Sequence, residues 1–149
     1  MKILLTIEDA KYAEAAVHAL VRQIRPEGAE VCVFHVVAPL IIIPYGYMGQ
    51  VETLEAAQEV RRKEGKELAE HAAQQLRAAG FQVHLLLGDG DPKTAILDKA
   101  QEWNADVIFM GSHGRRGIER FLIGSVSETV LRHASCSVEV VRSPAVAAA

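Results

Sequence analysis

The sequence predicts an α/β fold, a single-domain open sheet of five parallel strands with helices on both faces. Apolar runs of strand length alternate with longer stretches of helical period, which favours β-α-β crossovers of right-handed sense. The strand-length runs are almost continuously apolar, as in parallel strands covered on both faces. A chain of 149 residues with 50% hydrophobic and 23% charged residues has the size and composition for one buried core.

The first two strands are expected over residues 2–7 and 30–37. Asp9 lies where a helix N-cap belongs, and Pro26 with Gly28 ends the helix that follows. The apolar stripe of that helix is Ala13, Ala16, Val17, Leu20, Val21 and Ile24. After the second strand, residues 38–50 are expected to be irregular.

A long polar helix is expected from about residue 52 to residue 79, with Gly80 as its C-terminal stop. The third strand then covers 81–88, and Asp91 with Pro92 predicts the start of the next helix. The remaining elements are a strand over 105–111, a helix over 126–133, a strand over Ser137–Val141 and a flexible tail over 143–149.

Charge and hydropathy exclude several function classes. A net charge of −3 and a pI near 6.1 give no general attraction to nucleic acid or to an anionic membrane. The opening MKILLTIEDA is too short for a signal peptide, and no stretch reaches the ~18 apolar residues that cross a bilayer. Cys32 and Cys136 lack metal-ligand spacing and are expected to be buried free thiols, which suits the cytoplasm.

The stretch MGSHGRRGIERFLIGSVS, residues 110–127, leaves the carboxyl end of the predicted fourth strand, where ligands bind in such sheets. Glycines let backbone amides approach an anion, and a helix beginning near Gly124 adds its N-terminal amides. The stretch is neither a Walker loop nor a Rossmann fingerprint. A second interpretation needs no ligand: Ser125 and Glu128 fit a capping box, and the glycines serve turns.

Gly111-x2-Gly114-x9-Gly124-Ser125 is similar to the nucleotide-binding signature of the universal stress protein family. The likeness extends from the first strand through FHVV and GDPKTAILDKAQEWNADVIFMG to the last strand, so that it covers essentially the whole chain. It implies a Rossmann-like fold of the adenine nucleotide alpha hydrolase type, in a protein that is usually dimeric. Members with this signature hold ATP or a related adenine nucleotide, here with Mg²⁺ or Mn²⁺ expected to bridge the phosphates.

The resemblance also implies a role for each matching position. Thr6 and Glu8 would face the base and ribose, with Val36 and Met110 forming walls for the adenine. The positions expected to line ribose and phosphates are Gly111, His113, Gly114, Gly124, Ser125, Val126 and Ser127. Arg115, together with Arg116 and Arg120, would either neutralise the γ-phosphate or present a basic rim to an acidic partner.

This sequence departs from the family pattern at two positions. Glu8 replaces the usual aspartate, so it either accepts from a ribose hydroxyl or points to solvent while Asp9 only caps the helix. Ser137 stands where proline is common, which affects the edge strand rather than the pocket. His35 is interpreted as a core histidine with its hydrogen bonds satisfied, and His113 as a hydrogen-bonding group rather than a general base.

No catalytic residue is named, and three functions stay open: an ATP-binding stress regulator, a dimeric interaction module with an empty pocket, and a slow ATP hydrolase. The strand over Ser137–Val141 would leave an unpaired edge, so a homodimer through this strand is expected. PLIIIPYGYM, residues 39–48, is interpreted as a lid or a subunit contact.

Overall fold

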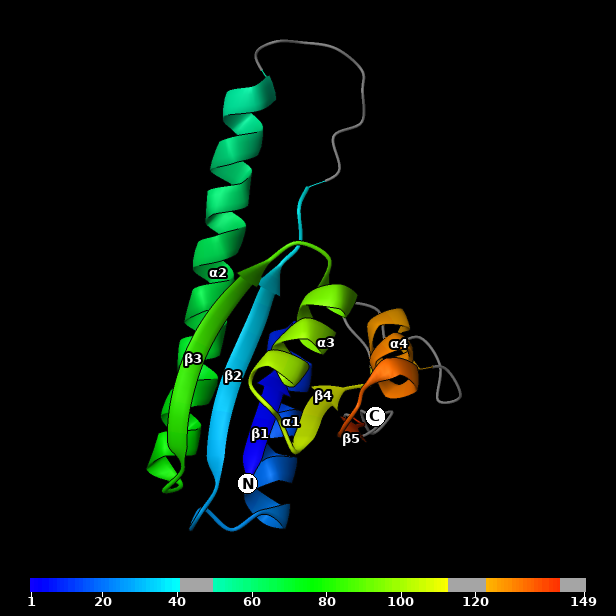
Figure 1. The fold of residues 1–149 in the computed structure, drawn as a ribbon. Coiled ribbons are helices and arrows are strands. Elements are labelled where there is room, and N and C mark those ends of the chain that lie inside the picture. The colour runs from blue at the N-terminus through cyan, green and yellow to red at the C-terminus, as the bar shows by residue number, and fades with distance from the viewer. Residues whose placement is uncertain (41–49, 113–122, 143–149) are drawn as a thin grey trace, which may run out of the picture.

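A computed structural model describes residues 1–40, 50–112 and 123–142 of the chain (Figure 1). Five strands alternate with four helices in the described part, as the sequence predicted. In order, these elements are β1 (Lys2–Thr6), α1 (Ala10–Gln23), β2 (Glu30–Val37), α2 (Gln50–Ala78), β3 (Gln82–Asp89), α3 (Pro92–Glu102), β4 (Val107–Gly111), α4 (Ser125–His133) and β5 (Ser137–Val141).

The strands form one parallel sheet in the order β3-β2-β1-β4-β5. The chain first builds outward from β1 through β2 to β3, and then crosses back to place β4 on the other side of β1. The strand order therefore reverses between β1 and β4. In open α/β sheets, ligands bind outside the carboxyl ends of the strands at such a reversal.

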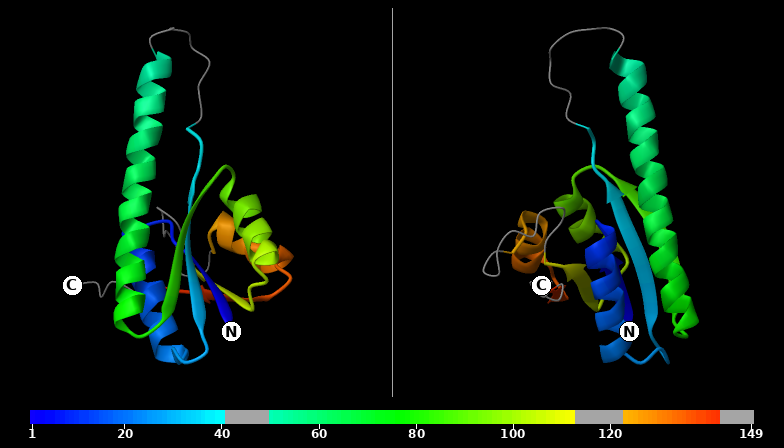
Figure 2. Two further views of the ribbon diagram at one scale, coloured as in Figure 1. Left: turned by 60° about the vertical axis from the view of Figure 1, so that its left-hand side comes forward. Right: turned by 180° about the vertical axis from the view of Figure 1, so that it is seen from behind.

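Helices cover both faces of the sheet, α1 and α2 on one side and α3 and α4 on the other (Figure 2). Alternate residues of β1, β2, β4 and β5 feed two separate apolar clusters, whereas β3 contributes to one of them only. Ile3 and Leu5 pack with the α1 and α2 side chains, whereas Leu4 packs with Ile96 of α3 and Val130 of α4. Burial on both faces explains why β1, β2 and β4 are almost continuously apolar. The parallel sheet with helices on both faces confirms the predicted fold class.

Two predicted helix starts are confirmed by their caps. The Asp9 carboxylate accepts a hydrogen bond from the Tyr12 amide at 3.1 Å, and Asp91 accepts from the amide and hydroxyl of Thr94. Pro92 occupies the first turn of α3. The predicted stop of α2 is also present, because Gly80 has φ +95° and the Phe81 amide returns to the Leu76 carbonyl.

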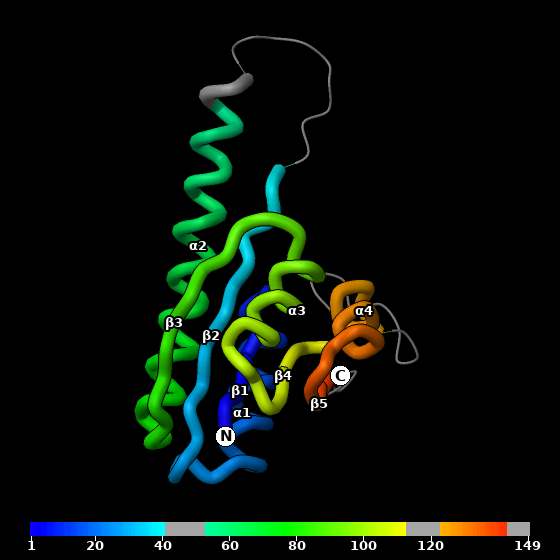
Figure 3. Tube along the Cα trace, in the orientation of Figure 1, coloured from blue at the N-terminus to red at the C-terminus, as the bar shows by residue number. Residues whose placement is uncertain are grey.

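The tube drawing shows α2 running past the carboxyl ends of the strands (Figure 3). Its N-terminal half therefore rises beside the edge of the sheet where a ligand is expected. Two polar contacts tie this part of α2 to strand ends: Gln58 Nε2 donates to the Ala38 carbonyl at 3.3 Å, and Arg62 pairs with Asp89.

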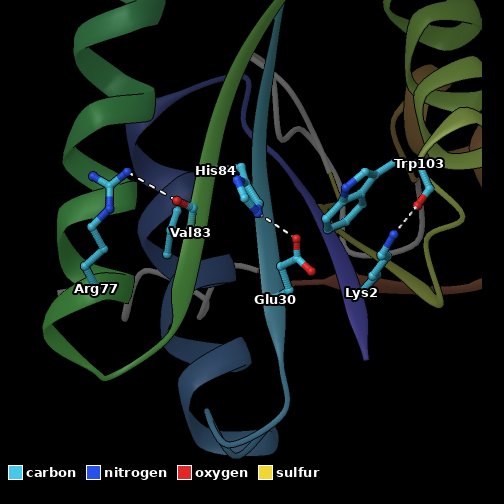
Figure 4. A network of polar contacts seen from close by, with 6 residues as sticks. All are labelled: Lys2, Glu30, Arg77, Val83, His84 and Trp103. Carbon is cyan, nitrogen blue, oxygen red and sulfur yellow. Dashed lines mark hydrogen bonds and ion pairs between the residues drawn. The ribbon is translucent and has the colours of Figure 1, made fainter.

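Polar contacts at the opposite end of the sheet are structural (Figure 4). His84 Nε2 lies 2.6 Å from Glu30 Oε1 on the neighbouring strand, and Lys2 Nζ donates to the Trp103 carbonyl at 3.3 Å. The Lys2 ammonium also lies 5.4 Å from the Trp103 ring centroid. Trp103 is thus a packing residue at the end of α3, as its place after the apolar stripe predicted.

Both cysteines are free thiols, as predicted. Cys32 is buried, and this burial raises the pKa of its thiol to about 11, more than the nearby Lys99 ammonium lowers it. Cys136 differs from the prediction because it is only half-buried.

Candidate functional site

A cleft of about 400 Å³ lies at the carboxyl ends of β1 and β2 and is walled by α2. Its floor comes from the turn after β1 and from the last residues of β2, whereas its side comes from the fourth to sixth turns of α2. The lining residues are Glu8, Asp9, Ala10, His35, Val36, Val37, Ala38, Arg61, Glu64, Gly65, Leu68 and Pro92.

Glu8 lines this cleft and also a much smaller recess on the β4 side. Glu8 is an exposed residue, yet partial desolvation by the surrounding walls raises the pKa of its carboxyl, and the negative charge of Asp9 raises it further. The structure confirms the Asp9 cap, and the contact between Glu8 and a ribose stays a prediction. Asp9 caps α1, and the Glu8 side chain still borders both hollows.

His35 forms part of the cleft floor and is half-buried. Its Nδ1 lies 2.7 Å from the Ile7 carbonyl oxygen, so Nδ1 carries the proton and donates. A Cβ on Gly65 of α2 would lie 2.3 Å from the ring atoms Cδ2 and Nε2. The predicted hydrogen bond of His35 is present at Nδ1, but the residue lies half-buried on the cleft floor rather than in the core. The missing side chain of Gly65 makes room for its ring.

The smaller recess lies at the reversal of strand order and is lined by Thr6, Glu8, Tyr12, Ala13, Met110 and Gly111. Thr6 and Met110 are both buried, with 5% and 2% of their surfaces exposed. Gly111 has a packing reason to be glycine, because a Cβ there would lie 2.8 Å from Tyr12 Cβ. Helix α1 therefore approaches this glycine closely, whereas the predicted approach of a ligand stays a prediction.

The described ends of the loop between β4 and α4 are joined by hydrogen bonds. The Gly124 amide donates to the Ser112 carbonyl at 2.6 Å, and Ser127 Oγ donates to the Gly111 carbonyl at 2.6 Å. Ser127 is 3% exposed. Its hydroxyl proton is therefore already committed to the protein, whereas its oxygen retains acceptor capacity. These bonds hold the first turn of α4 against the end of β4.

The N-terminus of α4 has no side-chain cap. Gly124 is the N-cap residue, and Ser125 is already the first helical residue, so the capping box proposed for Ser125 and Glu128 does not form. Glu128 instead pairs with Arg132 at 3.0 Å, one turn along the helix. The φ of −63° at Gly124 is open to any residue, so what the glycine supplies here is the lack of a side chain.

The structure brings most of the described candidates to one edge of the sheet. Glu8 and Val36 lie in the cleft, Thr6, Met110 and Gly111 line the recess, and Gly124, Ser125, Val126 and Ser127 begin α4. His113, Gly114 and Arg115 lie outside the described residues, as do Arg116, Arg120 and residues 41–48 of the apolar segment.

Sequence reasoning missed the wall that α2 contributes. Arg61, Glu64, Gly65 and Leu68 look like ordinary positions of a polar helix. A glycine within a long helix was the available signal, since glycine costs about 1 kcal/mol relative to alanine there and needs a packing reason.

Two further results concern metals and membranes. Among the described residues, no group of three or more His, Cys, Asp or Glu side chains is arranged to hold a metal ion. In the same described residues, no helix has the length and apolar character that a bilayer-spanning segment needs.

The fold defines a class of protein, the open parallel α/β proteins, in which ligands bind outside the carboxyl ends of the strands. A family model described as "Universal stress protein family" matches residues 1–142. Universal stress protein MJ0531 of Methanocaldococcus jannaschii is 34% identical over 132 residues, which are 88% of this chain and 75% of that protein. The chain therefore belongs to the universal stress protein family, which confirms the resemblance seen in the sequence.

Solved structures give the same result for the fold. Protein MJ0577, described in a structure-based assignment of biochemical function, is 28% identical with a TM-score of 0.75, covering 95% of this chain and 94% of that one. UspA from Lactobacillus plantarum gives a TM-score of 0.81 at 23% identity, covering 95% of this chain and 97% of that one. A universal stress protein from Archaeoglobus fulgidus in complex with dAMP gives 0.63 at 22% identity, covering 95% of this chain and 97% of its own.

Proposed function

We propose that this protein binds an adenine nucleotide, ATP in the first place, across the carboxyl ends of β1, β2 and β4, and acts as a stress-response regulator. The observation that carries the proposal is that two features suited to different parts of a nucleotide lie together at the carboxyl ends of the strands. An acidic and apolar cleft suits a nucleoside, and an uncapped helix N-terminus suits phosphate. The dAMP complex of the Archaeoglobus relative supports the ligand class.

The cleft matches the base and ribose. Just after β1, the Ile7 amide donates to the Phe34 carbonyl of β2 at 3.0 Å. Because alternate residues of a strand face the same neighbour, the amide and carbonyl of Val36 face the β1 side beyond this bond. They offer one donor and one acceptor to an adenine edge, while the Glu8 carboxylate accepts from ribose hydroxyls.

The β4–α4 junction matches the phosphates. The first amides of α4 carry partial positive charge and meet no side-chain cap, so an anion at this position would satisfy them. Mg²⁺ keeps several water ligands and binds through phosphates, so the arrangement of described residues fits a cation carried by the nucleotide rather than by a protein cage. Gly111, His113, Gly114 and Arg115 complete the proposed phosphate side, as the resemblance implies.

Mass spectrometry of gently purified and then denatured protein should detect an adenine nucleotide, and Mg-ATP should raise the unfolding temperature. Gly124→Val should abolish the ATP-dependent shift while leaving the circular dichroism spectrum unchanged. Absence of both nucleotide and thermal shift in the wild-type protein would overturn the proposal and favour an interaction module with an empty pocket.

We also propose a homodimer through β5, in the cytoplasm. β5 pairs only with β4 among the described strands, and its last four residues stay half-buried rather than buried. The Val141 carbonyl accepts from the Ser112 amide, so odd-numbered residues of β5 face β4 and Val138 and Val140 turn their amides outward. A second copy of this edge would pair those groups.

Val140→Pro tests the dimer because proline removes an outward amide without removing a bond to β4. In size-exclusion chromatography, the variant should elute as a monomer where the wild-type protein elutes as a dimer. Glu139→Gln changes a residue whose backbone groups face β4, and it should leave the dimer intact. A monomeric wild-type protein, or a Val140→Pro variant that stays dimeric, would contradict the β5 interface.

A further inference from the structure

We propose that His35 is a positioning residue that keeps the Val36 backbone available to the base, and that Gly65 of α2 is glycine in order to hold the His35 ring in place. This inference rests on the proposed nucleotide site and names the device that prepares it. It concerns one hydrogen bond, from His35 Nδ1 to the Ile7 carbonyl at 2.7 Å, and one close packing contact.

The parallel ladder between β1 and β2 stops one step early. Thr6 pairs with Phe34, and the Ile7 amide donates to the Phe34 carbonyl at 3.0 Å. In a continued ladder, the Ile7 carbonyl would next accept the Val36 amide. Instead, the Ile7 carbonyl accepts a hydrogen bond from Nδ1 of the His35 ring. β1 therefore ends at Thr6 rather than at Ile7, where the apolar run of the sequence had placed its end.

The consequence for Val36 is an amide without a strand partner at the floor of the cleft. In the part of the chain that the structure describes, no backbone bond reaches this amide, and Val36 lines the cleft together with Glu8. A donor beside a cleft can bind a ligand only if the protein does not use it first. The imidazole removes the competing acceptor by donating to it, and the same bond fixes the peptide unit that leads into Glu8.

Gly65 fixes the imidazole from the other side. A Cβ at this position would lie 2.3 Å from Cδ2 and from Nε2 of His35, and 3.2 Å from Cε1. These separations are far below van der Waals contact, so any side chain at residue 65 would move the ring away from the Ile7 carbonyl. Gly65 is buried in the middle of α2, where no turn requires a glycine.

The first experiment replaces His35 and measures ATP and GTP binding by calorimetry. His35→Asn places an amide nitrogen near the position of Nδ1 and should keep ATP affinity within about threefold, whereas His35→Leu should weaken ATP binding about tenfold. His35→Gln, which mimics Nε2 instead, should resemble His35→Leu. GTP binding should change little across the three variants, because Val36 is expected to select the adenine edge.

The outcomes separate this inference from the proposed function. Wild-type protein that binds neither nucleotide overturns the proposed function. Wild-type binding with equal ATP affinities for His35→Leu and His35→Asn overturns the positioning role alone. An equal loss of ATP and GTP in His35→Leu also overturns it, because that result is expected from general damage to the cleft.

A second measurement tests the geometry without any ligand. Gly65→Ala should lower the urea midpoint of the wild-type protein, because the new methyl group meets the imidazole. In a His35→Ala background the same substitution should raise the midpoint, since alanine is the better helix former once the ring is gone. The same sign in both backgrounds would show that Gly65 and His35 are not coupled, and would overturn the proposed reason for the glycine.

Discussion

The two sides of the candidate site are built differently. On one side, which we term the α2 wall, the contacts are made by side chains. The His35 ring packs against Gly65 of α2, while the α2 side chains of Gln58 and Arg62 bond to the Ala38 carbonyl and to Asp89. On the other side, which we term the α4 wall, the contacts use backbone groups. The Gly124 amide donates to the Ser112 carbonyl, and the Ser127 hydroxyl donates to the Gly111 carbonyl.

Each wall has a glycine whose place is filled by a ring-bearing side chain from a neighbouring element. His35 fills the space at Gly65, and Tyr12 fills the space at Gly111. Only Gly111 belongs to the sequence signature. The comparison teaches that a glycine in the candidate site can be required by packing between protein elements. Membership of the signature therefore does not show whether a glycine makes room for a ligand or for a neighbouring side chain.

The largest effect on stability is expected from Gly111→Ala. Its methyl group would meet Tyr12 Cβ at 2.8 Å, and Cβ is fixed to the α1 backbone, so relief needs a shift of the helix. We expect a loss of about 1–3 kcal/mol in the free energy of unfolding, measured by urea denaturation. Gly88→Ala is the matched control, because it meets the tip of the Phe34 ring at the same 2.8 Å and this tip can turn aside. An equal or larger loss in the control would contradict the argument.

Gly124→Asp should separate stability from binding on the α4 wall. An aspartate N-cap accepts first-turn amides, so the free protein should gain a few tenths of a kcal/mol. The same carboxylate would occupy and repel the phosphate position, and nucleotide affinity should fall at least about tenfold, or about 1.4 kcal/mol. Gly124→Asn controls for charge and should weaken binding less. Unchanged ATP affinity in Gly124→Asp would remove the α4 N-terminus from the site.

Glu8 gives a prediction in pH. Desolvation, followed by the charge of Asp9, raises the pKa of its carboxyl above the ordinary value of 4.5. If the carboxylate accepts from the ribose, nucleotide affinity should fall as pH decreases through this raised pKa. Glu8→Gln should bind more weakly than the wild-type protein at pH 7 and should lose that part of the pH dependence. Calorimetric titrations at several pH values measure both, and parallel pH profiles would exclude Glu8.

The same raised pKa also gives a prediction for folding stability, in which the wild-type protein loses stability relative to Glu8→Gln as pH rises. A carboxyl whose pKa is higher in the folded state stabilises the fold when protonated, and this contribution is lost as pH rises through the folded pKa. Glu8→Gln should therefore gain stability over the wild-type protein as pH rises from 4 toward 7, in thermal unfolding without nucleotide. If the stability advantage of Glu8→Gln over the wild-type protein shrinks as pH rises over this range, the raised pKa of Glu8 would be contradicted.

The smallest effect is expected at the outer end of the α2 wall. Asp89→Asn removes the ion pair with Arg62, in which the two side chains are 61% and 36% exposed. Solvent screens such a pair, so we expect a loss below about 1 kcal/mol and no change in nucleotide affinity. A clear loss of affinity would show that this contact sets the position of α2 over the cleft.

The fold was predictable because its signals are local. Apolar periodicity, Asp9 and Asp91 as caps, Pro92 in a first turn and Gly80 after a helix each act within a few residues, and each was confirmed. The strand ends were less predictable. β1 stops at Thr6 because a side chain from β2 takes the Ile7 carbonyl, a contact between residues far apart in the chain.

The candidate site divides in the same way. The sequence by itself determined the family, the parallel α/β sheet and the edge at which Glu8, Val36, Gly111 and Gly124 lie, since the order and period of the elements fix these. Only the tertiary structure decided that α2 forms a wall of the cleft, that Tyr12 fills the space beside Gly111 and that Ser127 donates to a carbonyl. These contacts depend on how closely helices approach the sheet, and that distance is set by packing between distant residues rather than by any local pattern.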